Sequence, residues 1–375
     1  MISLYVHWPY CSRICPYCDF NVTRDRGQAS QRNLFDAILT DLKTQASGLR
    51  DRQLASIFFG GGTPSLLPPA WVAELIETAR SLFQASPDPI EITLEANPTD
   101  AEISRYEGFR QAGINRLSLG VQSLDDTALR FLGRNHSAAE AVRGIETAQK
   151  VFGRVSLDLI YALPGQTAAG WDAELRTAAD LGIEHISPYQ LTIEPATAFG
   201  RAVQRKLWSP PADDLAESFY FQTQETLEAL GFEAYEVSNH ARGKAARSAH
   251  NVHVWEGVDY IGIGPGAHGR VTRDGSRHAT TALSDLKAYT MRVAETGIGC
   301  DVEPLSTTLE SEEEAAMLGL RLSEGLDLSR VPSLDLRSKA AHLIEGGFMA
   351  LAGDRLRATP KGRVVLDRLL FELLS

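Results

Sequence analysis

Three cysteines gather in one short run near the start of the chain, Cys11, Cys15 and Cys18, with the spacing C-x3-C-x2-C. Cysteine thiolates are the usual ligands of [4Fe–4S] clusters, and the cluster takes four ligands. A loop this short can supply three ligands and leave the fourth iron open. As in catalytic zinc sites, an open coordination position indicates a site that binds a substrate. The run therefore predicts a [4Fe–4S] cluster with one exchangeable iron.

Two other interpretations of these cysteines stay open. The thiols could hold zinc with His7 as the fourth ligand, or they could be reduced cysteines without a metal. Zinc ribbons usually carry two C-x2-C pairs, and this sequence has no second pair. Cys300 lies far along the chain, and we interpret it as a small buried apolar residue rather than a fourth ligand.

The composition fits a globular protein with one large and one smaller domain, since 43% of the 375 residues are hydrophobic and 23% are charged. No apolar run approaches the roughly 20 residues that span a membrane. The first residues lead directly into a strand-like stretch, which is not the pattern of a signal peptide. Since three of the four cysteines lie in one motif, no disulfide framework is expected, and the sequence predicts a cytoplasmic protein.

The net charge of −11 disfavours nucleic acid as a partner. A small basic group at Arg242, Lys244 and Arg247 is typical of a solvated surface, although its nearness to His250 would also suit an anionic ligand. The sequence leaves open whether the protein is a monomer or a dimer, and whether it makes a peripheral contact with a membrane.

Apolar β-rich runs alternate with amphipathic stretches through residues 1–232. The predicted strands are 2–6, 54–59, 90–94, 117–121, 155–160 and 185–191, and the predicted helices are 70–83, 101–112, 125–132, 138–151, 171–181 and 213–230. Such alternation predicts an α/β fold with a parallel sheet. Six βα units are too few for a closed eight-stranded barrel, so we expect an open, partial (β/α)6 barrel. In barrels of this kind the chemistry lies at the carboxyl ends of the strands.

Polar or glycine-rich groups stand at those strand ends. They are the glycines before Thr63 after the second strand, Glu95 after the third, Gln122 after the fourth with Arg134 one helix later, and Asp158 in the fifth. Each one alone could be a satisfied buried acid or a cap partner. Together they would converge on one mouth, which the cysteine loop also reaches.

The pattern changes after residue 232. Residues 233–300 form a β-rich linking segment that contains several histidines, and residues 301–375 form a small module. Helices near 312–322, 336–345 and 361–374 with a hairpin between them predict a winged-helix-like α+β domain. The module is not notably basic, so we expect it to pack on the barrel or to contact a partner rather than DNA.

The cysteine spacing resembles that of the radical S-adenosylmethionine (SAM) superfamily, in which the open iron binds SAM. Further motifs resemble its oxygen-independent coproporphyrinogen oxidase family: YVHWPYC at 5–11, GGGTPS at 60–65, LGVQS at 119–123, DLIYALPGQ at 158–166, GPGAH at 264–268, and the C-terminal module. The resemblance runs through almost the whole chain, and its motifs are specific as a set.

Two branches of this family differ near the cysteines. The true coproporphyrinogen dehydrogenase has an N-terminal arm and a fourth cysteine two residues after the third, where this chain has Phe20. Phe20, the missing arm and the motif HNVHVW at 250–255 resemble the haem-chaperone branch instead. Val254 replaces the tyrosine of that motif, which weakens any role assigned to that ring and leaves His250, Asn251 and Trp255 in place.

The resemblance also implies roles for individual residues. Cys11, Cys15 and Cys18 would hold the cluster. The predicted cofactor-binding residues are Tyr5, with Gly61, Gly62 and Thr63 close to SAM, Glu95 on its ammonium, Arg134 on its carboxylate, and Gln122 and Asp158 on its ribose hydroxyls. His250 would be an axial ligand of haem, with His253, His240 and His268 as alternatives. From the residues alone, His250 could equally be a surface or capping histidine.

The implied function is a haem chaperone that binds one haem and passes it to acceptor proteins such as respiratory haem enzymes, with slow or incidental SAM cleavage. The alternative is the dehydrogenase, which oxidatively decarboxylates coproporphyrinogen III propionates to vinyl groups. Phe20 and the missing arm count against it. A third interpretation is another radical SAM reaction on a tetrapyrrole, such as ring opening or methyl transfer.

Overall fold

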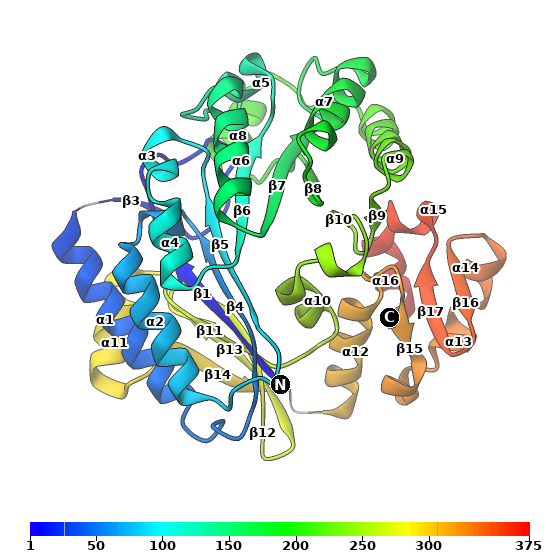
Figure 1. The fold of residues 1–375 in the computed structure, drawn as a ribbon. Helices are drawn as coiled ribbons and strands as arrows, with labels where there is room; N and C mark the ends of the chain where they lie inside the picture. Colours follow the sequence, from blue (N-terminus) through cyan, green and yellow to red (C-terminus); the bar gives the residue numbers. More distant parts are fainter. Residues whose placement is uncertain (26, 306) are drawn as a thin grey trace.

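The structure, a computed structural model, describes residues 1–25, 27–305 and 307–375. Its centre is an open sheet with the strand order β14-β13-β12-β11-β1-β4-β5-β6-β7-β8-β10-β9 (Figure 1). Neighbouring strands are parallel from β11 to β8: β11 (Tyr260–Ile263), β1 (Ile2–Trp8), β4 (Leu54–Gly61), β5 (Glu91–Ala96), β6 (Arg116–Gln122), β7 (Arg154–Tyr161) and β8 (His185–Gln190). The six strands predicted for the partial barrel are all confirmed, and β11 adds a parallel strand next to β1.

Antiparallel strands extend the sheet on both sides. On the β11 side are β12 (His268–Arg273), β13 (Ser276–Ala282) and β14 (Cys300–Pro304), and on the β8 side are β10 (His240–Ala241) and β9 (Glu233–Ala234). Ile261, Val271 and the buried Cys300 belong to the same hydrophobic core as the barrel strands. Residues 260–300 are therefore part of the barrel sheet, which they extend beyond β1.

Helices connect the parallel strands, as parallel pairing requires. They are α1 (Gln28–Gln45), α2 (Pro69–Leu82), α3 (Asp100–Ile103), α4 (Tyr106–Ala112), α5 (Asp126–Phe131), α6 (Ala138–Val151), α7 (Ala168–Asp180), α8 (Ala198–Gln204) and α9 (Asp213–Ala229), with α10 (Ala249–Trp255) and α11 (Leu286–Thr296) further along. Ser137 begins α6 with a capping box to Glu140. Ala141, Ile145 and Ala148 then bury one face at helical spacing.

The sequence pattern and the helices differ in several places. The single helix predicted at 101–112 is two helices, α3 and α4, and between them the Arg105 side chain donates to the carbonyl oxygens of Ser65 and Leu67. Helices α1, α8, α10 and α11 were not predicted. None of the helices in the described ranges is long and apolar enough to cross a membrane.

The C-terminal module has its own hydrophobic core, which includes Leu320, Met349 and Leu356. Its elements are α12 (Thr308–Gly319), β15 (Leu326–Asp327), α13 (Leu336–Lys339), α14 (Ala341–Glu345), β16 (Met349–Ala352), β17 (Arg355–Ala358), α15 (Pro360–Arg363) and α16 (Leu366–Leu374), with the antiparallel sheet order β15-β17-β16. Glu314 on α12 forms ion pairs with Arg270 and Arg277 of β12 and β13. The predicted α+β module is confirmed, and it is joined to the barrel sheet.

Candidate functional site

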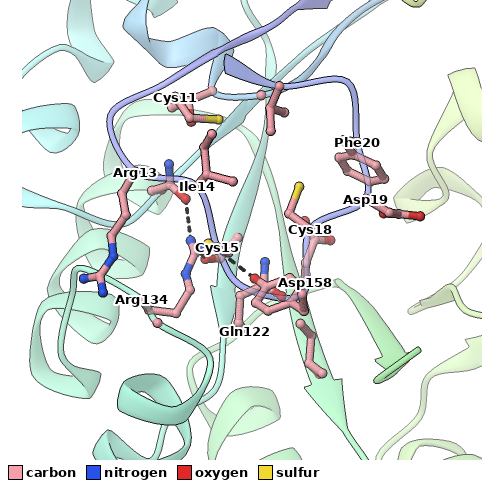
Figure 2. A pocket seen from close by; sticks show the side chains of 18 of the residues that line it. Cys11, Arg13, Ile14, Cys15, Cys18, Asp19, Phe20, Gln122, Arg134 and Asp158 are labelled. Carbon is pink, nitrogen blue, oxygen red and sulfur yellow. Dashed lines mark hydrogen bonds between the residues drawn. The ribbon is translucent and has the colours of Figure 1, made fainter. Parts of the chain in front are cut away.

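A cavity of about 510 Å³ lies where the carboxyl ends of the parallel strands meet the cysteine loop. Figure 2 shows Cys11, Cys15 and Cys18 around it, with Gln122, Arg134 and Asp158 from the strand side. The other predicted residues that line it are Gly61, Gly62, Thr63 and Glu95. The structure thus brings together all the predicted site residues except Tyr5 and His250.

The end of β4 holds the cysteine loop in the cavity wall. The Gly62 backbone N–H donates to the Trp8 carbonyl (2.8 Å), and the Thr63 N–H donates to the Tyr10 carbonyl (2.9 Å). A Cβ atom at Gly62 would lie 2.8 Å from the Tyr10 carbonyl oxygen, so glycine is required for this close approach. Cys11 follows directly, and its thiol is hydrogen-bonded to the Thr63 side chain.

Cys11 and Cys18 are poor thiolates on their own. Burial raises the pKa of the Cys11 thiol and raises that of Cys18 to about 11, and the charge of neighbouring cysteines adds to both shifts. Three thiolates on one cavity therefore need a strong positive partner, and the donor set is that of an iron–sulfur cluster. Within the described ranges, no group of three His, Cys, Asp or Glu side chains is placed to hold a single metal ion.

His7, the fourth ligand in the zinc interpretation, uses both ring nitrogens elsewhere. Its Nε2 is 2.9 Å from the Asn21 carbonyl oxygen, and its Nδ1 is 3.2 Å from the Tyr5 hydroxyl oxygen. Burial lowers the pKa of this imidazole, so the ring is neutral and is held by these two contacts. The arrangement argues against a zinc site that includes His7.

Arg134 spans from the cysteine loop to the strands. Its Nη1 donates to Cys15 Sγ (3.2 Å), and its Nη2 donates to the Gly120 carbonyl (2.8 Å) and to Asn97. Its Nε is buried and finds no acceptor among the described residues. A buried unpaired N–H on a cavity wall suits an acceptor from a ligand.

Tyr17 was not predicted as a site residue, yet its hydroxyl accepts a hydrogen bond from Arg134 Nη1 (3.4 Å) in the cavity wall. Its place between Cys15 and Cys18 is the signal that could have indicated it, because a residue inside a ligand loop must lie near the ligands.

Two half-buried acids face the same cavity, Glu95 and Asp158. Burial raises the pKa of Glu95 to about 8, helped by the nearby Asp158, although the Gly61 N–H donates to Glu95 (3.2 Å). Burial likewise raises the pKa of Asp158 to about 6, opposed by hydrogen bonds from Ser187 and Ser118. A positively charged ligand would favour the ionised form of both acids.

Gln122 reaches the cavity through an irregular strand end. Its φ is +68°, a conformation that residues other than glycine rarely adopt. At this point the register between β6 and β7 shifts, between Leu119 and Gln122. The irregularity turns the Gln122 side chain to the cavity wall, and strained backbone of this kind is common at functional sites.

Tyr5 and His250 lie inside the barrel, away from the cysteines. Their rings are 6.3 Å apart, and the His250 ring is 5.0 Å from that of Phe58. His250 Nδ1 is hydrogen-bonded to Ser56 Oγ (3.0 Å), and burial lowers the pKa of the imidazole to about 4. Neither residue lines the cysteine cavity.

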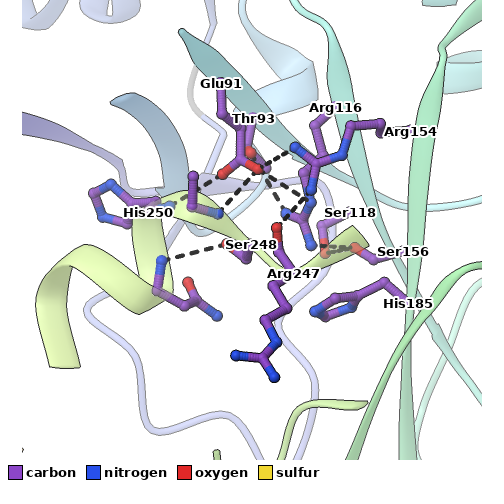
Figure 3. Close-up of polar contacts among 12 residues, drawn as sticks. Glu91, Thr93, Arg116, Ser118, Arg154, Ser156, His185, Arg247, Ser248 and His250 are labelled. Atoms are coloured by element: carbon purple, nitrogen blue, oxygen red, sulfur yellow. Dashed lines mark hydrogen bonds and ion pairs between the residues drawn. The ribbon is translucent and has the colours of Figure 1, made fainter. Parts of the chain in front are cut away.

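Helix α10, which carries His250, is bonded to the amino ends of the strands (Figure 3). The Glu91 carboxylate at the start of β5 accepts the backbone N–H groups of Ala249 and His250, both at 3.1 Å. Glu91 also pairs with Arg154 (2.6 Å), which donates to the Arg247 carbonyl (2.6 Å). Since the cysteine cavity lies at the carboxyl ends, His250 and the cysteines occupy opposite ends of the barrel.

The partial barrel and its cavity of three cysteines define a radical SAM protein. The model of the radical SAM superfamily matches residues 5–178, and the model of the HemN C-terminal domain matches residues 309–365. The chain belongs to the family that contains the heme chaperone HemW and the radical SAM domain-containing protein 1, which confirms the family expected from the motifs.

Relatives align over most of their length. The heme chaperone HemW of Mycobacterium tuberculosis is 34% identical, with 100% of this chain and 95% of the relative covered. That of Escherichia coli is 39% identical over 72% of this chain and 70% of the relative. The mitochondrial radical SAM domain-containing protein 1 of Danio rerio is 38% identical over 99% of this chain and 86% of the relative.

A solved structure supports the fold. Coproporphyrinogen III oxidase (HemN) from Escherichia coli superposes with a TM-score of 0.84 over 100% of this chain and 90% of the other, at 24% identity. The two chains therefore share the same architecture.

Proposed function

We propose that this protein is a haem chaperone, which binds haem and passes it to acceptor proteins such as respiratory haem enzymes. The observation that carries the proposal is the alignment with relatives named heme chaperone along the whole chain. Phe20 supports it, because this side chain is 61% exposed at the rim of the cysteine cavity, in the place where the dehydrogenase branch is expected to have a cysteine.

The cysteine cavity would hold the [4Fe–4S] cluster and SAM. A bound cluster, itself reduced by an external electron donor, would supply the electron for reductive cleavage of SAM. Cys11, Cys15 and Cys18 would ligate the cluster, and the Arg134 Nε–H, which is unpaired among the described residues, would donate to the SAM carboxylate. Glu95 would accept from the SAM ammonium, whose charge would favour the ionised carboxylate.

The other cavity residues would position SAM. Gln122 and Asp158 would hydrogen-bond its ribose hydroxyls, and Gly61, Gly62 and Thr63 would border it along the end of β4. Tyr5 would act indirectly, because its hydroxyl holds His7 behind the cavity and does not reach the cavity itself.

His250 remains the proposed haem ligand. Its imidazole is neutral because burial lowers its pKa to about 4, and the free base is the form that binds iron. In this conformation the ring is enclosed by Tyr5 and Phe58, so coordination of haem would require α10 to move away from β1 and β4.

A haem titration of the anaerobically reconstituted protein tests the proposal, followed by absorbance in the Soret region. The His250→Ala variant is run beside it, with His278→Ala as the matched control, because the half-buried His278 imidazole bonds, among the described residues, the Ser276 carbonyl of its own strand and no other strand. We expect saturable one-to-one binding that only His250→Ala weakens. If His250→Ala binds haem as tightly as the wild type, the chaperone proposal still holds and the iron ligand is another histidine.

Failure of the folded, cluster-loaded protein to bind haem at micromolar concentration would refute the chaperone proposal. The next assay would then be anaerobic conversion of coproporphyrinogen III in the presence of SAM and a reductant. Formation of protoporphyrinogen IX would establish the dehydrogenase.

A further inference from the structure

A second cavity, of about 200 Å³, lies between the barrel and the C-terminal module. Figure 1 shows α10 next to α12, on the side of the barrel where this module packs. Asn251, Val254 and Trp255 of α10 form one side, Arg321 closes it from the C-terminal module, and Tyr189 and the loop at Glu236 complete it. His250 points to the other side of α10, into the barrel, so the motif at 250–255 serves two different places.

Arg321 supplies the cation among the lining residues of this second cavity. Its guanidinium carbon lies 4.6 Å from the centre of the Trp255 ring, so the group is stacked on an aromatic face. Its Nε is buried and has no hydrogen-bond acceptor in the part of the chain that the structure describes. A fixed, stacked guanidinium with a free N–H is well suited to a carboxylate.

Glu236 is the one acid that lines the cavity; it forms a long ion pair with Arg321 but no hydrogen bond to it. Its Oε1 accepts from the Ser238 N–H (2.7 Å) and from the Asn239 side chain. Its Oε2 is 4.0 Å from Arg321 Nη2, which is too long for a hydrogen bond. The Asn251 side chain, on the facing helix, also makes no hydrogen bond within the described ranges, so it can add a donor to the guanidinium.

The size of the cavity limits its occupant. About 200 Å³ is below the roughly 300–1,000 Å³ of a pocket that encloses a whole small molecule. It is enough for a short chain that ends in a carboxylate, while the body of the ligand lies outside. The walls contributed by Val254, Trp255 and Tyr189 are apolar or aromatic, which suits the edge of a flat ring attached to that chain.

We propose that this second cavity binds a propionate group of the haem, with Arg321 as the residue that recognises the carboxylate. The inference rests on the haem-chaperone function proposed above and adds a specific subsite to it. It also gives the C-terminal module a role in binding, because Arg321 belongs to that module and lies two residues after the end of α12.

The second cavity adjoins the cysteine cavity. Tyr189 lines both, and its side chain is 41% exposed between them. The Ser187 hydroxyl donates to Asn239 Oδ1 (2.9 Å), and Ser187 also lies close enough to Asp158 of the cysteine cavity to lower the pKa of that acid. Asn239 in turn bonds Glu236. A haem whose propionate is held at Arg321 would therefore lie within reach of the rim where Phe20 and Tyr189 are exposed.

The test compares haem with haem dimethyl ester, in which both propionates are esterified and uncharged. Each is titrated into the full-length, cluster-loaded protein, for the wild type, Arg321→Gln, Arg321→Lys and the control Arg337→Gln. Arg337 lies in the same module but is exposed and paired with Asp354 (2.7 Å). Thermal unfolding and iron content of each variant show whether it is folded and loaded.

We expect the wild type and Arg337→Gln to bind haem about tenfold more tightly than its ester, as one charge-assisted hydrogen-bonded pair implies. Arg321→Gln should bind haem about tenfold more weakly and lose the preference, with binding of the ester unchanged. Arg321→Lys, which keeps the charge, should retain part of the preference and serves as the readout if Arg321→Gln does not fold.

The outcomes separate the two proposals. If the wild type binds haem but a folded Arg321 variant keeps the full preference for the free acid, the carboxylate subsite is wrong and the chaperone stands. A wild type that binds haem and its ester equally leads to the same conclusion. If the wild type binds neither, the chaperone proposal fails and this subsite fails with it.

Discussion

Replacement of Glu91 by glutamine should loosen helix α10 and destabilise the whole barrel. The Glu91 side chain is 3% exposed, pairs with Arg154 at 2.6 Å and lies 3.9 Å from Arg116, whose side chain is also 3% exposed. It accepts two backbone N–H groups at the start of α10. Glutamine keeps the shape and one acceptor oxygen, but it leaves the two arginines without their counter-charge.

The size of the effect follows from burial. Removal of one partner from a buried ion pair typically costs about 3–5 kcal/mol, because the other charge stays buried. Arg116 is fully enclosed, whereas the Arg154 side chain is 31% exposed and can recover part of its hydration. We therefore expect Glu91→Gln to lower the free energy of unfolding by about 3 kcal/mol at pH 7, the lower end of that range.

The loss should depend on pH in a definite direction. Burial alone would raise the pKa of Glu91, but Arg116, Arg154 and the two backbone N–H groups together hold it below the usual value. Since the folded pKa is the lower one, the carboxylate contributes its full stabilisation above the unfolded pKa of about 4.3. This contribution is lost as the pH falls through the folded pKa, so the difference between wild type and Glu91→Gln should shrink in acid.

Urea unfolding from pH 7 to below the unfolded pKa, down to about pH 3, measures this difference directly. Glu74→Gln is the control, since Glu74 is a half-exposed carboxylate in a surface pair with Arg32 and should leave the unfolding curve unchanged. A Glu91→Gln variant that unfolds like the wild type at pH 7, or a difference that stays constant into acid, would refute the role of Glu91 as the charged anchor of α10.

Three further predictions concern the cysteine cavity. Cys18→Ser should lose bound iron and sulfide after anaerobic reconstitution. Cys300→Ser should keep both, because Cys300 is buried in the core and does not line the cavity. Equal iron content in the two variants would contradict the ligand assignment. Arg134→Gln should bind SAM about tenfold more weakly in equilibrium dialysis at unchanged iron content, and undiminished affinity would show that its Nε–H does not meet the carboxylate. Gly62→Ala should lower the free energy of unfolding, measured in urea, by about 1–3 kcal/mol, because the new Cβ would lie 2.8 Å from the Tyr10 carbonyl oxygen. Gly153→Ala should leave it unchanged, because a Cβ there has no atom within 4 Å. Equal stability of the two variants would argue against the tight packing of the loop.

The cavity was largely predictable from the sequence because its residues obey a local rule. Each side chain stands at the carboxyl end of a predicted parallel strand, so the strand pattern alone places Glu95, Gln122 and Asp158 together. Tyr17 escaped prediction because a tyrosine within a loop has no periodic signal. The stretch from residue 260 reads as a strand in the sequence, but its pairing with β1 was not predicted, because β1 lies at the other end of the chain and no sequence spacing indicates that pairing.

The direction in which His250 points could not be predicted. A short motif shows that histidine, asparagine and tryptophan share one helix, but not which side of that helix meets the barrel. Contacts from distant strands decide this, namely Glu91 on the backbone of α10 and Ser56 on the imidazole. The same contacts turn Asn251 and Trp255 to the C-terminal module, where Arg321 completes a cavity that no sequence pattern indicated.

The position of β1 in the sheet has a consequence for biosynthesis. Leu4 pairs on one side with Ile57 and on the other with Ile261, about 250 residues later. On the ribosome, one edge of this apolar strand therefore stays unpaired until most of the chain has emerged. Unpaired apolar edges invite aggregation, and pairings between distant residues form slowly. The nascent N-terminal strand thus benefits from protection by cellular folding factors during synthesis, and slower translation before residue 260 would lengthen its exposure.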